Sequence, residues 1–401
     1  MKVVQINAVY GEKSTGLIVR DIQEMLLKEG VDAFVAYQKS KCIVPSGIKI
    51  GNKLDWKLHA IYTRLTGKQG YASKMSTRKF LGVLDDIKPE VIHLHNLHAN
   101  YINLPLLLKY CAQNNIKTIL TLHDCWFFTG KCFHFFDIGC ERYQEGCYKC
   151  PKKRLDIPNY TWDRSRKIWN ERKELFQSIP QLKVIGCSEW ISNLANSTEI
   201  FQGKYIRSIH NGIDVSIFKE RSRYLREELG IENTFVILCM ANKWFEPSNQ
   251  DVTECILKKV SNQTKILLVG CNEMQKRQLN NDRRILPLGY IHEREKLADI
   301  YSAADIFLNL SVIDNLPTVN MEAIACGTPV ICYNNSGGGP ELIEEGITGF
   351  VVDKFDGDTI AKIINQLMKK GIDRYKCIRN AEYRFSKEMN YKKYLEEYLN
   401  W

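Results

Sequence analysis

The chain has 401 residues, of which 44% are hydrophobic and 25% are charged, and its formal net charge is +10. This length predicts two domains that each bury a core, and the composition excludes a disordered or strongly acidic protein. No apolar run approaches the ~18–20 residues that a membrane-spanning helix needs, and the first seven residues predict a strand rather than a secretion signal. We therefore expect a folded, mildly basic protein in the cytoplasm.

Strands and helices alternate along the first half of the chain, which is typical of a doubly wound parallel sheet. The expected strands are apolar and rich in β-branched residues: Lys2–Asn7, Val31–Tyr37, Val91–Leu94, Lys117–Leu122 and Leu182–Gly186. The expected helices include Gly16–Glu29 and Asn103–Cys111, in which apolar residues recur at helical spacing.

Ligands of such sheets bind at the carboxyl ends of the strands. The loop at residues 8–16 follows the first strand and holds two glycines, so Gly16 would start a helix beside an anion site. His95 and His98 follow one strand, and His123 follows the next. A single histidine is more often structural, but two clusters at one sheet edge favour a binding site.

Four of the fourteen cysteines crowd into a loop-like stretch: Cys132, Cys140, Cys147 and Cys150. The last two form a Cys-x-x-Cys pair, and four thiolates could hold a structural zinc ion that fixes this long loop. A second Cys-x-x-Cys pair is missing, so two disulfides, or thiols without a joint role, fit the spacing as well. The other cysteines lie mostly in apolar segments, where a free thiol behaves as a small hydrophobe.

A second alternation of strands and helices begins near Tyr205 and predicts another doubly wound sheet. Its expected strands are Phe235–Met240, Lys265–Val269, Ile306–Leu310 and Pro329–Tyr333, and its expected helices are Glu293–Ala303 and Asp356–Lys370. No internal repeat or low-complexity linker separates the two halves of the chain.

The segment from residue 314 to residue 341 predicts a loop, a helix, a strand and a glycine loop. Pro317 suits the first helical position, and Gly327 would end the helix. The unpaired amides and the dipole at the start of this helix favour an anion such as phosphate. Glu322 would lie on the helix, one turn from its start, and Asp314 on the loop before it.

These two acids, the following Glu-Ala-Ile-Ala-Cys-Gly-Thr-Pro-Val and the glycine turn before Pro-Glu resemble the signature of retaining glycosyltransferases of family 4. The family usually has glutamate at both acidic positions, so Asp314 is a shorter first member. The resemblance extends from the first strand to the last helix. It implies the GT-B fold, an α/β fold in which two doubly wound Rossmann-like domains face each other across a cleft. By analogy, residues 1–204 form the acceptor-side domain, to which residues 385–401 return, and residues 205–384 form the nucleotide-sugar donor domain.

The resemblance also implies roles for single residues. Glu322 would bind the ribose hydroxyls, Asp314 would hold the sugar, and His123 would contact its outer hydroxyls, so Asp314 and His123 are the expected catalytic residues. The other residues expected to bind the donor are Gly16, Lys243, Asn315, Leu316, Pro317, Thr318, Gly337, Gly338 and Gly339. We expect His95 and His98 on the acceptor side.

The chain departs from the family where the donor diphosphate is usually neutralised. Relatives usually carry an arginine after the strand that here ends at Met240, and a lysine five residues later. Lys243 can take the position of the arginine, but Ser248 stands at that of the lysine. Asn249, helix-terminal amides or another basic residue would compensate, or the affinity for the donor is weak.

The implied reaction is transfer of a hexose from a UDP-type or GDP-type nucleotide sugar to a glycan or lipid-linked acceptor, with retention and without a catalytic metal. Such hexosyltransferases serve bacterial polysaccharide biosynthesis, including capsule, O-antigen and exopolysaccharide. The alternatives are a non-catalytic interaction protein held together by zinc and a GT-B sugar-nucleotide epimerase. A dehydrogenase would need Gly-x-Gly-x-x-Gly after a strand, which the first loop lacks.

A basic segment lies between Lys53 and Lys79, where Asp55 is the one acid. Its seven cations are Lys53, Lys57, Arg64, Lys68, Lys74, Arg78 and Lys79. Because aromatic and aliphatic residues are interleaved with them, the segment could rest on an anionic bilayer at the inner face of the plasma membrane. A solvated basic face fits the same pattern. We do not expect nucleic-acid binding, because the excess charge is spread and no binding motif is present.

Overall fold

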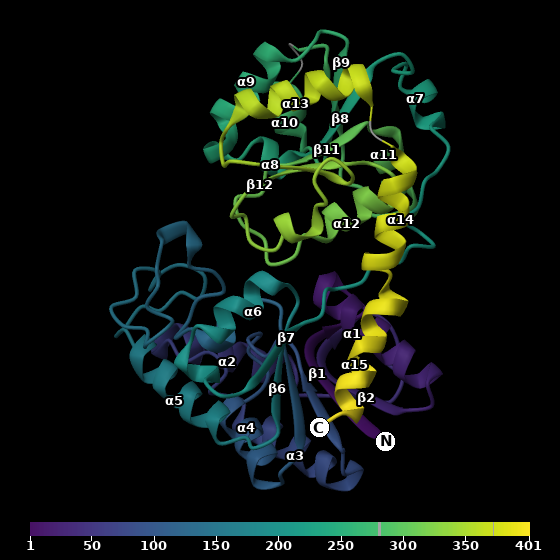
Figure 1. Cartoon of the computed structure of the whole chain (residues 1–401). Coiled ribbons are helices and arrows are strands. Elements are labelled where there is room, and N and C mark those ends of the chain that lie inside the picture. The colour runs from purple at the N-terminus through teal and green to yellow at the C-terminus, as the bar shows by residue number, and fades with distance from the viewer. Residues whose placement is uncertain (280–281, 372) are drawn as a thin grey trace. The chain divides into compact units, whose positions relative to one another are not determined.

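The computed structural model describes residues 1–279, 282–371 and 373–401, which divide into two compact units (Figure 1). Unit 1 comprises Met1–His210 and Tyr391–Trp401, and unit 2 comprises Asn211–Asn390. The boundaries expected from the sequence, after residues 204 and 384, lie a few residues earlier. None of the helices in the described ranges is long and apolar enough to cross a membrane.

Unit 1 contains a parallel sheet of seven strands in the order β3-β2-β1-β4-β5-β6-β7. The strands are β1 (Lys2–Tyr10), β2 (Asp32–Ser40), β3 (Gly47–Lys49), β4 (Val91–Leu94), β5 (Lys117–Leu122), β6 (Leu182–Gly186) and β7 (Tyr205–Ser208). The strand order reverses between β1 and β4, the point at which doubly wound sheets bind ligands. β7 pairs with β6 and completes this sheet, so the second series of elements begins after β7 rather than at Tyr205.

The helices of unit 1 connect these strands. They are α1 (Lys13–Lys28), α2 (Lys53–Thr66), α3 (Lys74–Ile87), α4 (Leu104–Gln113), α5 (Ser165–Gln177) and α6 (Glu189–Asn196), with the short helices η1 (Trp126–Phe128), η2 (Phe136–Ile138) and η3 (Glu199–Phe201). The start of α4 illustrates the local cause, because the Asn103 side chain accepts the amide of Leu106 and Pro105 stands in the first turn.

The last helix, α15 (Lys387–Leu399), lies beside the elements of unit 1 (Figure 1). Tyr391, Tyr394 and Tyr398 are buried in one apolar cluster with Ile18 and Ile22 of α1. The burial of three aromatic rings explains why the end of the chain belongs to this unit.

Unit 2 contains a parallel sheet of six strands in the order β10-β9-β8-β11-β12-β13. The strands are β8 (Phe235–Met240), β9 (Thr264–Val269), β10 (Ile285–Leu288), β11 (Ile306–Asn309), β12 (Val330–Tyr333) and β13 (Gly349–Val352). Here the strand order reverses between β8 and β11, so the loops after these two strands lie at the ligand-binding edge.

Helices flank the sheet of unit 2 as expected for a doubly wound fold. They are α7 (Tyr224–Glu228), α8 (Ala241–Trp244), α9 (Gln250–Lys259), α10 (Glu273–Gln278), α11 (Arg294–Ala303), α12 (Thr318–Ala325), α13 (Gly357–Lys370) and α14 (Arg374–Phe385), with the short helices η4 (Pro247–Asn249) and η5 (Pro340–Leu342). The core joins Ile237, Leu308 and Ile331 of the central strands to Ile256 of α9 and Ile360 of α13.

Candidate active site

Two loops of unit 2 meet at the carboxyl edge of its sheet, after β11 and after β12. The Asp314 amide donates to the Ser336 carbonyl at 2.8 Å, and the Gly338 amide donates to the Asp314 carbonyl at 3.0 Å. Asp314 and Gly337 thus form an isolated parallel bridge. The structure therefore brings the predicted loop acid and the predicted glycine loop into direct contact.

Gly337 is required by this contact. Its φ is +94°, and a Cβ on it would lie 1.9 Å from the Asp314 carbonyl oxygen. Both the left-handed backbone and the missing space exclude a larger residue without movement of one loop. The glycine thus fixes how closely the loop before α12 approaches the glycine loop.

The helix α12 begins one residue later than predicted. Pro317 is its N-cap, with φ −72° and ψ 104°, and the first helical residue is Thr318. Proline has no polar side chain that could cap the first amides, and among these the Asn320 amide donates to the Pro317 carbonyl at 3.1 Å. The Leu316 amide is already used, because it donates to Asp314 Oδ1 at 3.1 Å. Of the predicted amides, that of Thr318 thus stands at the helix N-terminus, and Gly327 ends the helix with a φ of +77°.

Glu322 is half-buried on α12, and the Tyr301 hydroxyl of α11 donates to its Oε2 at 3.3 Å. Burial raises the pKa of Glu322 to about 7, although Arg294 and the Tyr301 hydroxyl both act to lower it. The carboxyl group therefore titrates near neutral pH in the unliganded protein. The partner tyrosine was not predicted from the sequence.

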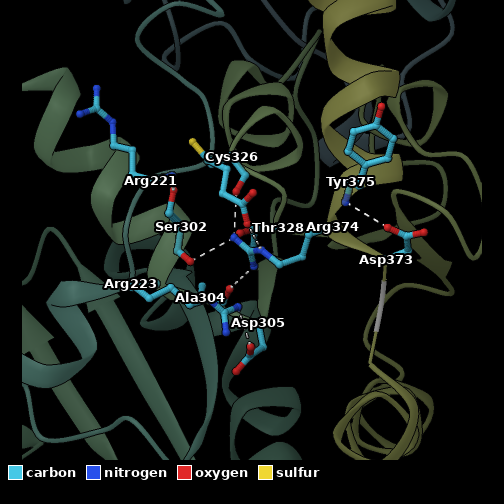
Figure 2. Close-up of polar contacts among 12 residues, drawn as sticks. Arg221, Arg223, Ser302, Ala304, Asp305, Cys326, Thr328, Asp373, Arg374 and Tyr375 are labelled. Carbon is cyan, nitrogen blue, oxygen red and sulfur yellow. Dashed lines mark hydrogen bonds and ion pairs between the residues drawn. The ribbon is translucent and has the colours of Figure 1, made fainter.

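Arg374 fastens the ends of the two helices that carry Tyr301 and Glu322. Figure 2 shows its side chain reaching the end of α11, where it donates to the carbonyls of Ser302 (3.0 Å) and Ala304 (2.9 Å). It also donates to the carbonyl of Cys326, the C-cap of α12, at 2.9 Å. A cation at two helix C-termini satisfies carbonyls that the helices leave unpaired. Arg374 therefore holds together the C-terminal ends of α11 and α12, the two helices that carry Tyr301 and Glu322.

The loop after β8 carries the one predicted cation, Lys243, in the short helix α8. Its ammonium lies 3.0 Å from Glu246 Oε2, so a carboxylate already partners it. The predicted compensation by Asn249 is wrong, because this side chain is fully buried and its amide donates to the carbonyls of Lys243 and Leu310. Its oxygen accepts from the Tyr333 hydroxyl. Asn249 thus positions the loop and is not available to a diphosphate.

Gly16 of unit 1 lies inside α1 rather than at its start, since the helix begins at Lys13. It is buried, and a Cβ on it would lie 3.1 Å from Val9 Cγ2 and 3.3 Å from the Gly11 amide nitrogen. The Gly11 amide also donates to the Gly16 carbonyl at 2.9 Å. Gly16 therefore allows the loop after β1 to lie close against the first turn of the helix.

The predicted histidines gather at the carboxyl ends of β4 and β5. His123 Nε2 lies 3.1 Å from His95 Nδ1, and His95 Nε2 lies 3.2 Å from Gln5 Oε1. Burial lowers the pKa of His123 to about 4 and holds that of His95 well below its usual value, so both imidazoles are neutral at neutral pH. His95 is fully buried with both ring nitrogens engaged. It therefore cannot contact an acceptor as expected and instead orients His123.

His98 remains partly exposed, and its Nε2 lies 2.9 Å from Asp124 Oδ2. Burial alone would raise the pKa of Asp124, but His98 and the Trp126 amide hold it below its usual value. This pair leaves His98 near the surface of unit 1, where its predicted contact with an acceptor remains a prediction.

The four clustered cysteines are all free thiols in the structure, which speaks against the two-disulfide alternative. A hydrogen bond from the Cys132 thiol lowers the pKa of Cys150 to about 7, and the Gly130 amide donates to Cys147 Sγ at 3.1 Å. Within the described ranges, however, no three Cys, His, Asp or Glu side chains converge as a metal site. The cysteines therefore approach one another without forming a closed tetrahedral set.

Comparison with known proteins bears on this geometry. Residues 219–384 match the family model of glycosyl transferases group 1. The matched residues include α12 and the glycine loop. This part of the chain thus matches glycosyl transferases group 1. The chain is also 23% identical to a putative colanic acid biosynthesis glycosyl transferase, WcaC of Escherichia coli, over 84% of each chain. The resemblance seen in the sequence is thereby confirmed for the group, while its assignment to family 4 stays a prediction.

Solved structures confirm the predicted GT-B fold. Sucrose-phosphate synthase of Thermosynechococcus elongatus is similar with a TM-score of 0.66 and 16% identity, over 99% of this chain and 98% of that one. HepE of Anabaena, solved in complex with UDP-glucose, gives a TM-score of 0.63 with 17% identity over 99% of each chain. The two parallel Rossmann-like sheets are thus arranged in the GT-B fold.

Proposed function

We propose that this glycosyltransferase moves a hexose from a nucleotide diphosphate sugar to a glycan or lipid-linked acceptor, with retention, in the cytoplasm of a bacterium. One observation carries the proposal: the loop before α12 pairs with the glycine loop at the carboxyl edge of the unit 2 sheet, and Glu322 lies on the helix that follows. The similarity to a putative colanic acid enzyme supports polysaccharide biosynthesis as the setting.

The diphosphate would lie at the start of α12, which has no side-chain cap. Negative charge grows on the departing diphosphate in the transition state, and fixed amide dipoles stabilise it without rearrangement. The Lys243 ammonium pairs with the Glu246 carboxylate in the unliganded protein. It would exchange this carboxylate for a phosphate oxygen of the donor and so contribute its positive charge. The missing second cation would leave the helix dipole with a larger share of this stabilisation.

The sugar and the ribose would be held by carboxylates and histidine. Glu322 would accept hydrogen bonds from the ribose hydroxyls, and Asp314 with Gly337–Gly339 would hold the hexose. His123 of unit 1 would contact the outer hydroxyls as a neutral imidazole, since its pKa is lowered to about 4. HepE was solved with UDP-glucose, so UDP-sugars are the first donors to test, with GDP-sugars as the alternative.

Product analysis tests the proposal. The protein is incubated with UDP-, GDP- and ADP-sugars, with and without a bacterial lipid and glycan extract, and both the released nucleotide and the sugar product are identified. We expect acceptor-dependent release of one nucleoside diphosphate together with a new glycoside. Conversion of the nucleotide sugar to its epimer without acceptor would contradict transfer, and so would the absence of turnover with every donor.

We also propose that the clustered cysteines bind structural zinc once their side chains rotate toward a common point. Zinc would hold the loop between Cys132 and Cys150, whose thiols already interact. Metal analysis of the purified protein is expected to find zinc that is reduced or lost in Cys147→Ser. Equal zinc in both proteins, or none in either, would reject the site.

A further inference from the structure

The helix α2 exposes a stripe of large aliphatic side chains: Leu54, Leu58, Ile61 and Leu65. Their exposed fractions lie between 52% and 63%. At 3.6 residues per turn, the spacings of four, three and four residues place all of them on one narrow face. Aliphatic side chains are normally scattered singly on a protein surface, so a continuous stripe indicates a surface that binds something apolar.

The opposite face of α2 is buried, and its contacts keep the aliphatic stripe turned toward solvent. His59, Ala60 and Thr63 are buried against unit 1. The Gly70 amide donates to His59 Nε2 at 3.1 Å, and His59 Nδ1 lies 2.8 Å from Ser73 Oγ. Because the helix is anchored by these contacts, the stripe cannot turn into the core without breaking them.

Cations run along one edge of the stripe. Lys53, Lys57 and Arg64 lie one beside another on the flank that helical geometry places next to the leucines. Asp55, the one acid between Lys53 and Lys79, is used for capping, because it accepts the Asn52 amide at 3.0 Å. The surface beside the aliphatic stripe therefore carries positive charge that its own helix does not neutralise.

Two exposed aromatic residues extend this surface beyond the end of α2. The Tyr160 amide donates to the Arg64 carbonyl at 3.2 Å, and Thr161 Oγ1 donates to the Leu65 carbonyl at 2.5 Å. These bonds hold Tyr160 (66% exposed) and Trp162 (74% exposed) beside the stripe. Tyrosine and tryptophan are enriched where apolar and aqueous phases meet.

We propose that this surface, formed by the aliphatic stripe, the flanking cations, Tyr160 and Trp162, docks on an anionic lipid bilayer. The aliphatic chains would enter the acyl boundary, the aromatic rings would lie at headgroup level and the cations would face lipid phosphates. The three cations of α2 outnumber its one acid, Asp55, and this excess of positive charge beside an apolar stripe favours an anionic bilayer as the partner. The inference rests on unit 1 alone and stands apart from the proposed transfer reaction.

Sedimentation with vesicles tests the docking surface. The whole chain is mixed with phosphatidylcholine vesicles, with or without phosphatidylglycerol, and the pelleted fraction is measured at low and high salt. We expect binding to the anionic vesicles that weakens with salt, and a partition coefficient reduced about tenfold or more in the variant Leu58→Glu/Ile61→Glu. Lys57→Gln/Arg64→Gln should reduce the binding to anionic vesicles but leave the fold intact.

The matched control is Met274→Glu/Tyr383→Glu, which makes the same change of charge at two exposed apolar positions of unit 2. It should bind vesicles like the wild type, and circular dichroism should show every variant folded. Failure of the wild type to bind anionic vesicles would overturn the proposal, as would equal binding by the stripe variant. A wild-type dimer that the stripe variant dissociates would show instead that a second copy covers the surface.

Discussion

Glu322→Gln is expected to lower the kcat/KM for sugar transfer by about a hundredfold or more while the protein remains folded. Hydrogen bonds to a charged group contribute about 1.5–3 kcal/mol each, and two ribose hydroxyls would lose the carboxylate together. Glutamine keeps the size of the side chain and can still accept from the Tyr301 hydroxyl, so the contact between α11 and α12 is preserved. Steady-state kinetics with the preferred donor would measure the loss, and wild-type rates would contradict the assigned role.

The pH dependence of the melting temperature and of the nucleotide affinity provides a second test of Glu322→Gln. Burial raises the pKa of Glu322 from 4.5 to about 7, so the folded state holds the proton more tightly than the unfolded state. The resulting stabilisation is full below pH 4.5 and is lost as the pH rises to 7. Glu322→Gln removes this loss, so its melting temperature relative to the wild type should rise across that interval. The nucleotide affinity of the wild type should increase through pH 7, and a similar increase in the variant would contradict the assignment.

Gly337→Ala is expected to weaken nucleotide-sugar binding by more than about tenfold and to lower the free energy of unfolding by about 1–3 kcal/mol. The added Cβ would lie 1.9 Å from the Asp314 carbonyl oxygen, so the two loops must separate. Separation breaks the hydrogen bond from Gly338 to Asp314 and moves the acid away from the start of α12. Calorimetry and chemical denaturation measure the two effects.

Gly346→Ala is the matched control for this steric argument. Its φ of +74° is also left-handed, but among the described residues no atom beyond its chain neighbours lies within 4 Å of a Cβ built on Gly346. It therefore carries the backbone strain without the clash and should retain nucleotide binding. Equal loss of binding in both variants would show that the close contact of the two loops does not matter.

The sequence predicts the central strands because they are continuous apolar runs. Phe235–Met240 and Val91–Leu94 are observed with the predicted bounds, since strands buried on both faces need uninterrupted hydrophobic side chains. Helix starts are harder to predict. Lys13 begins α1 with a left-handed φ of +57°, which no local preference of lysine indicates. The strand at Tyr205 belongs to unit 1 because of pairing with Lys183, a long-range contact that local sequence does not encode.

In the candidate site, too, features with a local sequence pattern could be predicted and long-range contacts could not. Asp314, Glu322 and Gly337 could be predicted because a helix start and a glycine turn leave a local pattern in the sequence. Tyr301 and Arg374 could not, because they reach α12 from other helices and only the folded unit brings them there. Sequence spacing likewise places His95 at a strand end but does not reveal that Gln5 and His123 occupy both of its ring nitrogens.

Calorimetric titration of the wild type with UDP, GDP, ADP and their sugars tests most directly whether unit 2 binds a nucleotide sugar beside Glu322. We predict that one nucleotide series binds with one site per chain, that Glu322→Gln and Gly337→Ala weaken this binding about tenfold or more, and that Gly346→Ala preserves it. Binding of the same nucleotide with unchanged affinity to Glu322→Gln, or binding of none of them to the wild type, would contradict the proposed site.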